Sequence, residues 1–243
     1  MITNAERWQL SDGELHYIWW FIQGSIMEAD VRWRLRRAWG MCQRHAWGTL
    51  AGEAAFRQNY FHGPAILYED ILGRALRAFE LTGPWPAARI ARRLRPTGPC
   101  MMCEMGFDRR SRGSFNRERL DAGRDLTMIR RFAATTSEYW TGTVCGKCSG
   151  EGSRARCRPH LLEDARRGAA VDLVADRATL AGILERLAVY ARSFRWESRD
   201  TATDRDRAAL LSAVGWCSGW EAGLALFGDC GIPPERELPG ALP

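Results

Sequence analysis

The sequence predicts an all-α protein, and three observations lead to that fold class. Apolar residues recur at three- and four-residue spacings in several stretches of the chain, which is typical of amphipathic helices. Alternating patterns typical of β-strands are almost absent. The 243 residues, 46% of them hydrophobic and 26% charged, have the composition of a folded protein with enough length for a sizeable core. We therefore expect an irregular helical bundle, in one large domain or two small ones.

The first predicted helix begins at a capping box, in which Ser11 is the N-cap and Glu14 stands three residues later. Apolar residues follow at helical spacing on one face, namely Leu15, Ile18, Trp19, Ile22 and Ile26. A second helix is expected to begin near Cys42. A third follows Pro64, a residue that suits the first turn of a helix, and ends at the Thr-Gly-Pro sequence 82–84.

The second half of the chain follows a loop signal of prolines and glycine at 96–99. Residues 104–115 are polar and rich in arginine, and we expect them to be poorly ordered. A helix is expected at 116–133, and then a loop rich in Gly, Ser and Cys at 141–156. Two closing helices are predicted by apolar stripes, one of Leu180, Ile183, Leu184, Leu187 and Phe194, the other of Leu210, Val214, Cys217, Trp220, Leu224 and Phe227.

These elements divide the chain into an N-terminal helical half at 1–95, a second half at 96–230 that packs on it, and a tail at 231–243 that we expect to fray. No apolar run approaches the roughly 18–20 residues of a membrane-spanning helix. The N-terminus lacks the basic and then apolar pattern of a secretory signal, so a cytoplasmic location is expected.

Most of the cysteines fall into short spacings that are typical of metal sites. Two CxxC knuckles and two CxxH pairs contain six of the eight cysteines and two of the four histidines, namely Cys100 and Cys103, Cys145 and Cys148, Cys42 and His45, and Cys157 and His160. Eight ligands are enough for two tetrahedral Cys3His zinc sites with none left over. We therefore expect two zinc ions per chain that stabilise loops and helix starts. An iron–sulfur cluster is the less favoured alternative.

The pairing between these motifs has two solutions. The compact pairing joins Cys145 and Cys148 to Cys157 and His160, since only eight residues separate the two motifs, and leaves Cys42, His45, Cys100 and Cys103 as a long-range site. The alternative joins the Cys100 knuckle to the Cys157 motif and the Cys145 knuckle to the Cys42 motif. We favour the compact pairing. Disulfides are not favoured, because they do not explain the CxxH pairs and do not suit a cytoplasmic protein.

Two sequences around these motifs, GMCQRHAW at 40–47 and RCRPHLLEDA at 156–165, resemble the glycine-cysteine-x-x-histidine helix starts of an uncharacterised bacterial family. In that family, CPxC-type knuckles alternate with CxxH helices in two helical repeats. The resemblance spans roughly residues 10–227 and implies a helical zinc-binding protein, without a known activity. The family pattern also expects a CxxC at about 10–13, which this chain lacks, and Cys145 and Cys148 look like an added knuckle that supplies the missing ligands. That pattern assigns the Cys100 knuckle to the Cys157 motif.

The charge of the chain gives a second candidate function. The formal net charge is +6, and 34 of the 35 basic residues are arginine, the exception being Lys147. Residues 89–131 contain twelve arginines and five acidic residues, so any anionic partner is expected there. The candidate residues for such a partner, a nucleic acid above all, are Arg92, Arg93, Arg95, Arg109, Arg110 and Arg112.

The remaining candidates are weaker. His62 with Glu69 and Asp70 could form a polar pocket, whereas a lone His16 and the adjacent Trp19 and Trp20 are more typical of surface and core packing. Cys217 is expected in the core and Cys230 near the tail.

Three functions are weighed on this basis. A zinc-stabilised adaptor or scaffold, which binds a protein or a small ligand, is favoured because Cys3His sites are normally closed and no catalytic set is visible. An arginine-rich nucleic-acid-binding regulator is the second function. The third is a metal-dependent or thiol enzyme, although a redox CxxC usually lies in a βαβ setting that this chain lacks.

Overall fold

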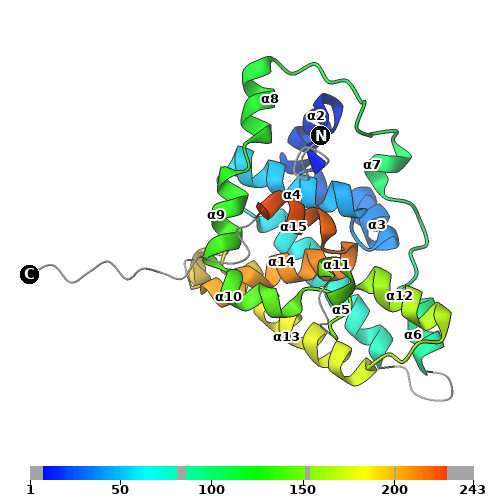
Figure 1. The fold of residues 1–243 in the computed structure, drawn as a ribbon. Helices are drawn as coiled ribbons and strands as arrows, with labels where there is room; N and C mark the ends of the chain where they lie inside the picture. Colours follow the sequence, from blue (N-terminus) through cyan, green and yellow to red (C-terminus); the bar gives the residue numbers. More distant parts are fainter. Residues whose placement is uncertain (1–7, 81–85, 151–153, 200, 229–243) are drawn as a thin grey trace, which may run out of the picture.

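A computed structural model describes residues 8–80, 86–150, 154–199 and 201–228 of the chain. This described part consists of helices and connecting loops and contains no β-strand, so the predicted all-α fold class is confirmed (Figure 1). The tail at 231–243 and Cys230 lie outside the described residues. In the described part, no helix combines the length and the apolar character needed to cross a membrane.

The described residues up to 80 form four α-helices and a 3-10 turn. They are α2 (Asp12–Ile22), η1 (Ser25–Met27), α3 (Ala29–Ala38), α4 (Gln43–Arg57) and α5 (His62–Phe79). The predicted capping box of α2 is present, because the Ser11 side chain accepts from the backbone N–H of Glu14 and the Glu14 carboxylate accepts from that of Ser11. The expected helix near Cys42 is α4, with Cys42 as its N-cap.

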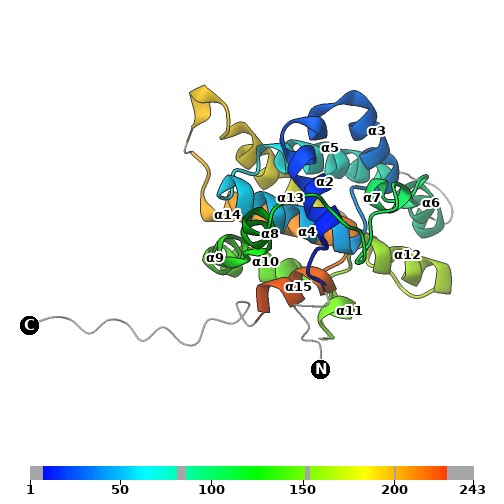
Figure 2. The same cartoon turned by 90° about the horizontal axis from the view of Figure 1, so that it is seen from above.

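The rest of the described chain adds shorter helices around two long ones. They are α6 (Pro86–Leu94), α7 (Met101–Glu104), α8 (Arg117–Arg124), α9 (Thr127–Thr135), α10 (Ser137–Trp140), η2 (Thr141–Thr143), α11 (Gly146–Ser149), α12 (Arg158–Arg167), α13 (Leu173–Arg192), η3 (Trp196–Ser198), α14 (Asp204–Ser218) and α15 (Glu221–Phe227). Helix α13 packs along both α5 and α14, and α4 contacts α2, α8, α9 and α15 (Figure 2). Helices from both halves of the sequence therefore share one apolar core.

An aromatic cluster joins α4 and α10 to α15 within this core. Trp220 stacks on Trp140 with ring centroids 5.5 Å apart, and Phe227 meets Trp47 edge-on at 5.4 Å. A Cβ atom on Gly215 would lie only 2.1 Å from Trp220, so only glycine lets the indole approach α14 this closely. Aromatic pairs of this kind contribute about 0.5–1.5 kcal/mol each beyond the area that they bury.

Two expectations from the sequence need correction. The helix expected at 116–133 is two helices, because Asp125 and Leu126 interrupt it, and Asp125 accepts from the backbone N–H of Thr127. The stripe from Leu210 to Phe227 is also divided, since Gly219 adopts a φ of 95° between α14 and α15. Periodicity alone does not reveal such breaks when both helices face the same core.

The segment expected to be poorly ordered at 104–115 has little regular structure but is held against α2. The backbone N–H of Gly13 donates to the carbonyl of Ser111 (2.9 Å), and the Ser11 hydroxyl donates to the carbonyl of Asp108 (2.7 Å). Phe115 stacks on the ring of His16 at 4.6 Å. Contacts with a helix about 100 residues earlier thus fix this loop, which its own composition does not predict.

Candidate metal centres

The structure gathers the eight Cys and His residues of the four motifs into two clusters. Within each cluster, the four candidate ligand atoms lie within 4.8 Å of one another. Site 1 consists of Cys42, His45, Cys100 and Cys103, and site 2 of Cys145, Cys148, Cys157 and His160. This grouping is that of the compact pairing. Each cluster could hold one metal ion.

Both sites have the same local architecture. One half is a knuckle whose first cysteine, Cys100 or Cys145, caps a single helical turn that carries the second cysteine. The other half is a CxxH pair whose cysteine, Cys42 or Cys157, is the N-cap of a longer helix. The histidine then lies in the first turn of that helix, close to the N-cap cysteine. A helix start therefore fixes both the thiol and the imidazole of each pair.

Site 1 depends on a tight turn between α3 and α4. Trp39 and Gly40 both adopt left-handed conformations, with φ of 61° and 94°. Gly40 also lies against Tyr68, whose hydroxyl would be 3.0 Å from an added Cβ atom. This turn explains the glycine of the GMCQRH sequence, because it reverses the chain so that Cys42 faces the α7 knuckle.

The imidazole of His45 faces the three sulfurs of site 1 with its Nδ1 atom. The Nδ1 atom lies 3.3 Å from the Sγ of Cys42, 3.5 Å from that of Cys100 and 3.4 Å from that of Cys103. The sulfurs of Cys42 and Cys103 are 3.7 Å apart. Cys103 is the exposed member of the group, whereas His45 is buried. Site 1 thus lies at the surface with its histidine toward the interior.

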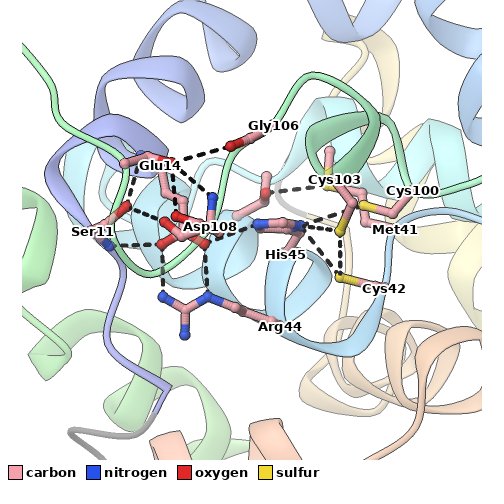
Figure 3. Close-up of polar contacts among 12 residues, drawn as sticks. Ser11, Glu14, Met41, Cys42, Arg44, His45, Cys100, Cys103, Gly106 and Asp108 are labelled. Carbon is pink, nitrogen blue, oxygen red and sulfur yellow. Dashed lines mark hydrogen bonds and ion pairs between the residues drawn. The ribbon is translucent and has the colours of Figure 1, made fainter.

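On the other side of the ring, Glu14 holds His45 in this orientation. The Nε2 atom of His45 lies 2.9 Å from Oε1 of Glu14, and Figure 3 shows the imidazole between this carboxylate and the sulfurs. A proton on Nε2 leaves Nδ1 free to bind a metal ion. Arg44 donates from Nε and Nη2 to the same carboxylate, at 2.7 Å in both cases.

Glu14 is fully buried, yet the pKa of its carboxyl is lowered to about 2. Burial alone raises this pKa, but the hydrogen bonds from His45, Arg44 and the backbone of Ser11 outweigh burial because they stabilise the charged form. A permanent negative charge therefore lies behind the imidazole. Such outer carboxylates increase the basicity of a metal-binding histidine.

Site 2 repeats the arrangement of the ligand atoms within a single short stretch of the chain. The Nδ1 atom of His160 lies 3.2 Å from the sulfur of Cys145, 3.4 Å from that of Cys148 and 3.3 Å from that of Cys157. The sulfurs of Cys148 and Cys157 are 3.8 Å apart. Cys145 and Cys157 are buried, and His160 is half-buried. In site 2, therefore, two of the three cysteines lie in the interior, and Cys148 is half-buried like the histidine.

The surroundings of site 2 differ from those of site 1. Among the described residues, none hydrogen-bonds to the Nε2 atom of His160. Instead, Asp164 on α12 pairs with Lys147 of the knuckle and with Arg156, whose Nε lies 3.0 Å from its carboxylate. These ion pairs fasten the knuckle to α12 without contacting the imidazole.

Hydrogen bonds within each cluster favour one thiolate even without a metal ion. In site 1 a hydrogen bond from Cys42 lowers the pKa of the Cys100 thiol, and in site 2 hydrogen bonds from Cys148 and Cys157 lower the pKa of Cys145. Metal ions bind the thiolate form of cysteine, so both clusters are chemically suited to a thiophilic cation.

The turn between α14 and α15 contacts the surroundings of both sites. The backbone N–H of Trp220 donates to the sulfur of Cys148 at 3.4 Å. On the other side, the Ser218 hydroxyl donates to the carbonyl of Met41 (3.0 Å), which precedes Cys42. Both metal sites are therefore fastened to the same buried turn.

The weaker candidates do not assemble into a further site. His16 packs on Phe115 and accepts from the backbone N–H of Ser114, which is a structural role. Asp70 forms an ion pair with Arg36 at 3.0 Å, whereas His62 is the first residue of α5 and lies beside Phe194. Trp20 is partly exposed, Trp19 packs on Phe56, and Cys217 is buried in the core.

The six arginines considered for an anionic partner are all exposed, but they lie in two places. Arg92, Arg93 and Arg95 belong to the end of α6, and Arg109, Arg110 and Arg112 to the loop between α7 and α8. Figure 1 shows α6 at the lower right and this loop at the top. A nucleic-acid interface on these residues stays a prediction.

No family model, no curated protein and no solved structure matches the chain. The resemblance to the bacterial family with CxxH helix starts therefore stays a prediction. The helical fold and the two Cys/His clusters come from the structure itself.

Glu14 and Arg44 are the residues of site 1 that the sequence did not reveal. The sequence identifies Glu14 only as a member of the capping box. It lies 31 residues before His45. The signal in the sequence is that an acidic residue of the capping box lies next to the apolar face of its helix, where its carboxylate could have a second role. That signal becomes specific only when α2 is known to pack on α4.

Proposed function

We propose that this chain is a zinc-stabilised helical binding protein, with one structural zinc ion in each cluster. The spacing of the ligand atoms carries the proposal. Tetrahedral zinc with bonds of about 2.3 Å to sulfur and about 2.0–2.1 Å to nitrogen has ligand atoms about 3.8 Å apart for two sulfurs and about 3.5 Å apart for sulfur and nitrogen. The separations of 3.7–3.8 Å between sulfurs and 3.2–3.5 Å between sulfur and nitrogen in the structure suit that geometry at both sites.

A single ion also suits these separations better than an iron–sulfur cluster. A cluster distributes its cysteines over several iron atoms, so the sulfurs must lie farther apart than in a mononuclear site. All four ligand atoms of each site lie within 4.8 Å. Three thiolates and one imidazole also form the Cys3His set that is typical of structural zinc.

The same ligand set favours binding over catalysis. Catalytic zinc usually has three protein ligands and an open position for water, whereas four protein ligands fill a tetrahedral site. Three thiolates also weaken the ion as a Lewis acid. The zinc ions would then fix helix starts in space, and the protein would act through the surfaces that those helices present.

Metal analysis of the purified chain tests this proposal. Elemental analysis combined with native mass spectrometry should find two zinc ions per chain, released together with loss of the fold. Chains with one ion, or with iron and a visible chromophore, would contradict two Cys3His zinc sites. Zinc that leaves the native protein readily in a mild chelator would contradict the structural role.

A further inference from the structure

A large cavity lies at the far end of α4 from site 1. Its volume is about 610 Å³, within the range of about 300–1,000 Å³ that is common for small-molecule sites. It is formed by the segment after α4, by the end of α13 and by the connection that leads to α14. Figure 2 shows that this connection, in gold and orange, projects from the helical body. Asn59 lies about 20 Å along α4 from His45, so the cavity is separate from the zinc sites.

The walls of the cavity are aromatic. Phe194 lies at the centre, with the rings of Tyr60 and Tyr190 at centroid distances of 5.1 and 5.0 Å, and Phe132 also lines the cavity. At the rim, Trp196 is 82% exposed, and no aromatic ring of a described residue packs against it. An indole this exposed beside a cavity provides a face on which a flat ring can stack.

The charge of the cavity is positive. Two arginines, Arg199 and Arg207, line it, and none of the described residues that line it is acidic. Arg207 also contacts Asp204 from one side, with Nη1 and Oδ1 3.2 Å apart, and its side chain stays 43% exposed. The buried Glu53 behind Tyr190 adds little negative charge near neutral pH, because burial raises the pKa of its carboxyl to about 8. An anionic group is therefore the complementary partner.

The left-handed segment that follows α4 contributes a polar residue to the same cavity. Gln58 and Asn59 follow α4 in consecutive left-handed conformations, with φ of 51° and 64°, a region that asparagine tolerates better than glutamine does. Asn59 lines the cavity, and its Oδ1 atom is buried without a hydrogen-bond partner among the described residues. The amide of Asn59 also donates from Nδ2 to the carbonyl of Met128 (3.3 Å), which fixes this residue in the cavity wall.

We infer that this cavity binds a small aromatic anion: a flat ring that stacks among Tyr60, Phe194 and Trp196 and carries a negative group toward Arg199 and Arg207. The inference rests on the proposed function in so far as it names a ligand class for a binding protein. A nucleoside monophosphate and an aromatic carboxylate share this chemistry, and competition distinguishes them.

Fluorescence titration of the zinc-loaded full chain with 1-anilinonaphthalene-8-sulfonate tests the inference, with N-phenyl-1-naphthylamine as the matched neutral probe. We expect one saturable site that prefers the sulfonate about tenfold over the neutral probe. Trp196→Ala should lower the affinity for both probes about tenfold. Arg207→Gln should lower the affinity for the sulfonate alone. Equal affinity for the two probes would overturn the inference.

Two control variants separate this site from general surface effects. Trp33→Ala removes another exposed tryptophan, on α3, and Arg117→Gln removes an exposed arginine on α8. Both should bind the sulfonate as the unaltered chain does. If Trp196→Ala and Arg207→Gln also leave binding unchanged, the cavity is not the site. Displacement of the probe by adenosine monophosphate or by 1-naphthoate supports the inference and identifies the source, and displacement by neither overturns it.

The zinc content of each sample is measured before the titration, so that a failure of the proposed function can be distinguished from a failure of the aromatic-anion site. A chain without two zinc ions contradicts the proposed function, whatever the probe does. A chain with two zinc ions whose binding ignores Trp196 and Arg207 contradicts the aromatic-anion site alone.

Discussion

Sites 1 and 2 have the same ligands and the same local motifs, but they hold the chain in different ways. Site 1 joins residues that are 61 positions apart, Cys42 and Cys103, whereas site 2 closes within 15 positions, from Cys145 to His160. Two doublings of loop length change the closure entropy by only about 1.2 kcal/mol. Loop length is therefore a minor part of the difference.

The main difference is what each site fastens to the fold. Site 1 connects α4 with the α7 knuckle and, through Glu14, with the start of α2. Site 2 fastens a short knuckle to α12 beside the buried turn at Trp220. The comparison teaches that one ligand set can organise long-range packing at one place and a local loop at another.

The largest expected effect follows from removing one ligand at each site. Cys100→Ser and Cys148→Ser should each lose about one equivalent of zinc, because three ligands bind the ion far more weakly than four. Structural zinc contributes about 10–16 kcal/mol of apparent binding energy in zinc-finger peptides, comparable with the whole stability of a domain. Cys100→Ser should also lower the melting temperature more than Cys148→Ser does, since site 1 holds three helices.

Cys217→Ala is the matched control, because Cys217 is a buried thiol outside both clusters. It should keep both zinc ions, as measured by elemental analysis. Unchanged zinc content and melting temperature in Cys100→Ser would remove Cys100 from the ligands of site 1.

The next prediction compares two buried glutamates at opposite ends of α4. Glu14 is paired, whereas an oxygen of Glu53 has no hydrogen-bond partner among the described residues, and burial raises the Glu53 pKa to about 8. Between pH 4.5 and 8 the folded chain therefore keeps a proton that the unfolded chain releases. Stability falls as the pH rises through this range, by about 3 kcal/mol from pH 5 to pH 7.5.

Glu53→Gln has no carboxyl group at this position and should lose that part of the pH dependence. Urea unfolding of both proteins at pH 5 and pH 7.5 checks it, since other titrating groups, the thiols included, are common to the two chains. Identical changes in unfolding free energy between the two pH values would contradict a buried, unpaired Glu53.

A smaller effect is expected from the carboxylate behind His45. Glu14→Gln keeps the shape and the capping capacity of the side chain but removes its charge, so zinc affinity at site 1 should fall by about 10–100-fold. Site 2 is the internal control, because no described carboxylate contacts the imidazole of His160. Competition with a zinc chelator measures both sites, and equal weakening of the two would contradict the specific role of Glu14.

The smallest effects are expected from the two capping boxes, at α2 beside site 1 and at α14 away from it. Ser11→Ala and Thr203→Ala each remove a side-chain oxygen that accepts from the third residue of the helix. Each should lower the free energy of unfolding by about 1 kcal/mol and leave two zinc ions bound. Loss of zinc from Ser11→Ala alone would show that the cap, and not only Glu14, maintains site 1.

The features that the sequence predicts well are local ones. They are the capping box at Ser11, the helix that starts after Cys42, and the Cys and His residues of the four motifs. Each is recognised from spacings of a few residues. The grouping in site 2 follows from proximity along the chain. These features need no knowledge of how distant helices pack.

The features that the sequence missed depend on contacts between distant segments. Glu14 meets His45 only because α2 packs on α4, and Ser111 meets Gly13 only because the loop before α8 crosses α2. The break at Gly219, with its φ of 95°, lies where Trp220 packs closely on Gly215. The periodicity of a single sequence contains no direct signal for such contacts between distant residues.

X-ray absorption at the zinc edge of the purified chain tests the central claim most directly, because it reports the ligands of the bound ion. The account predicts an average of three sulfur atoms and one nitrogen atom per zinc, at about 2.3 Å and about 2.0–2.1 Å. An oxygen ligand from water, or fewer than three sulfurs per zinc, would contradict two closed Cys3His sites.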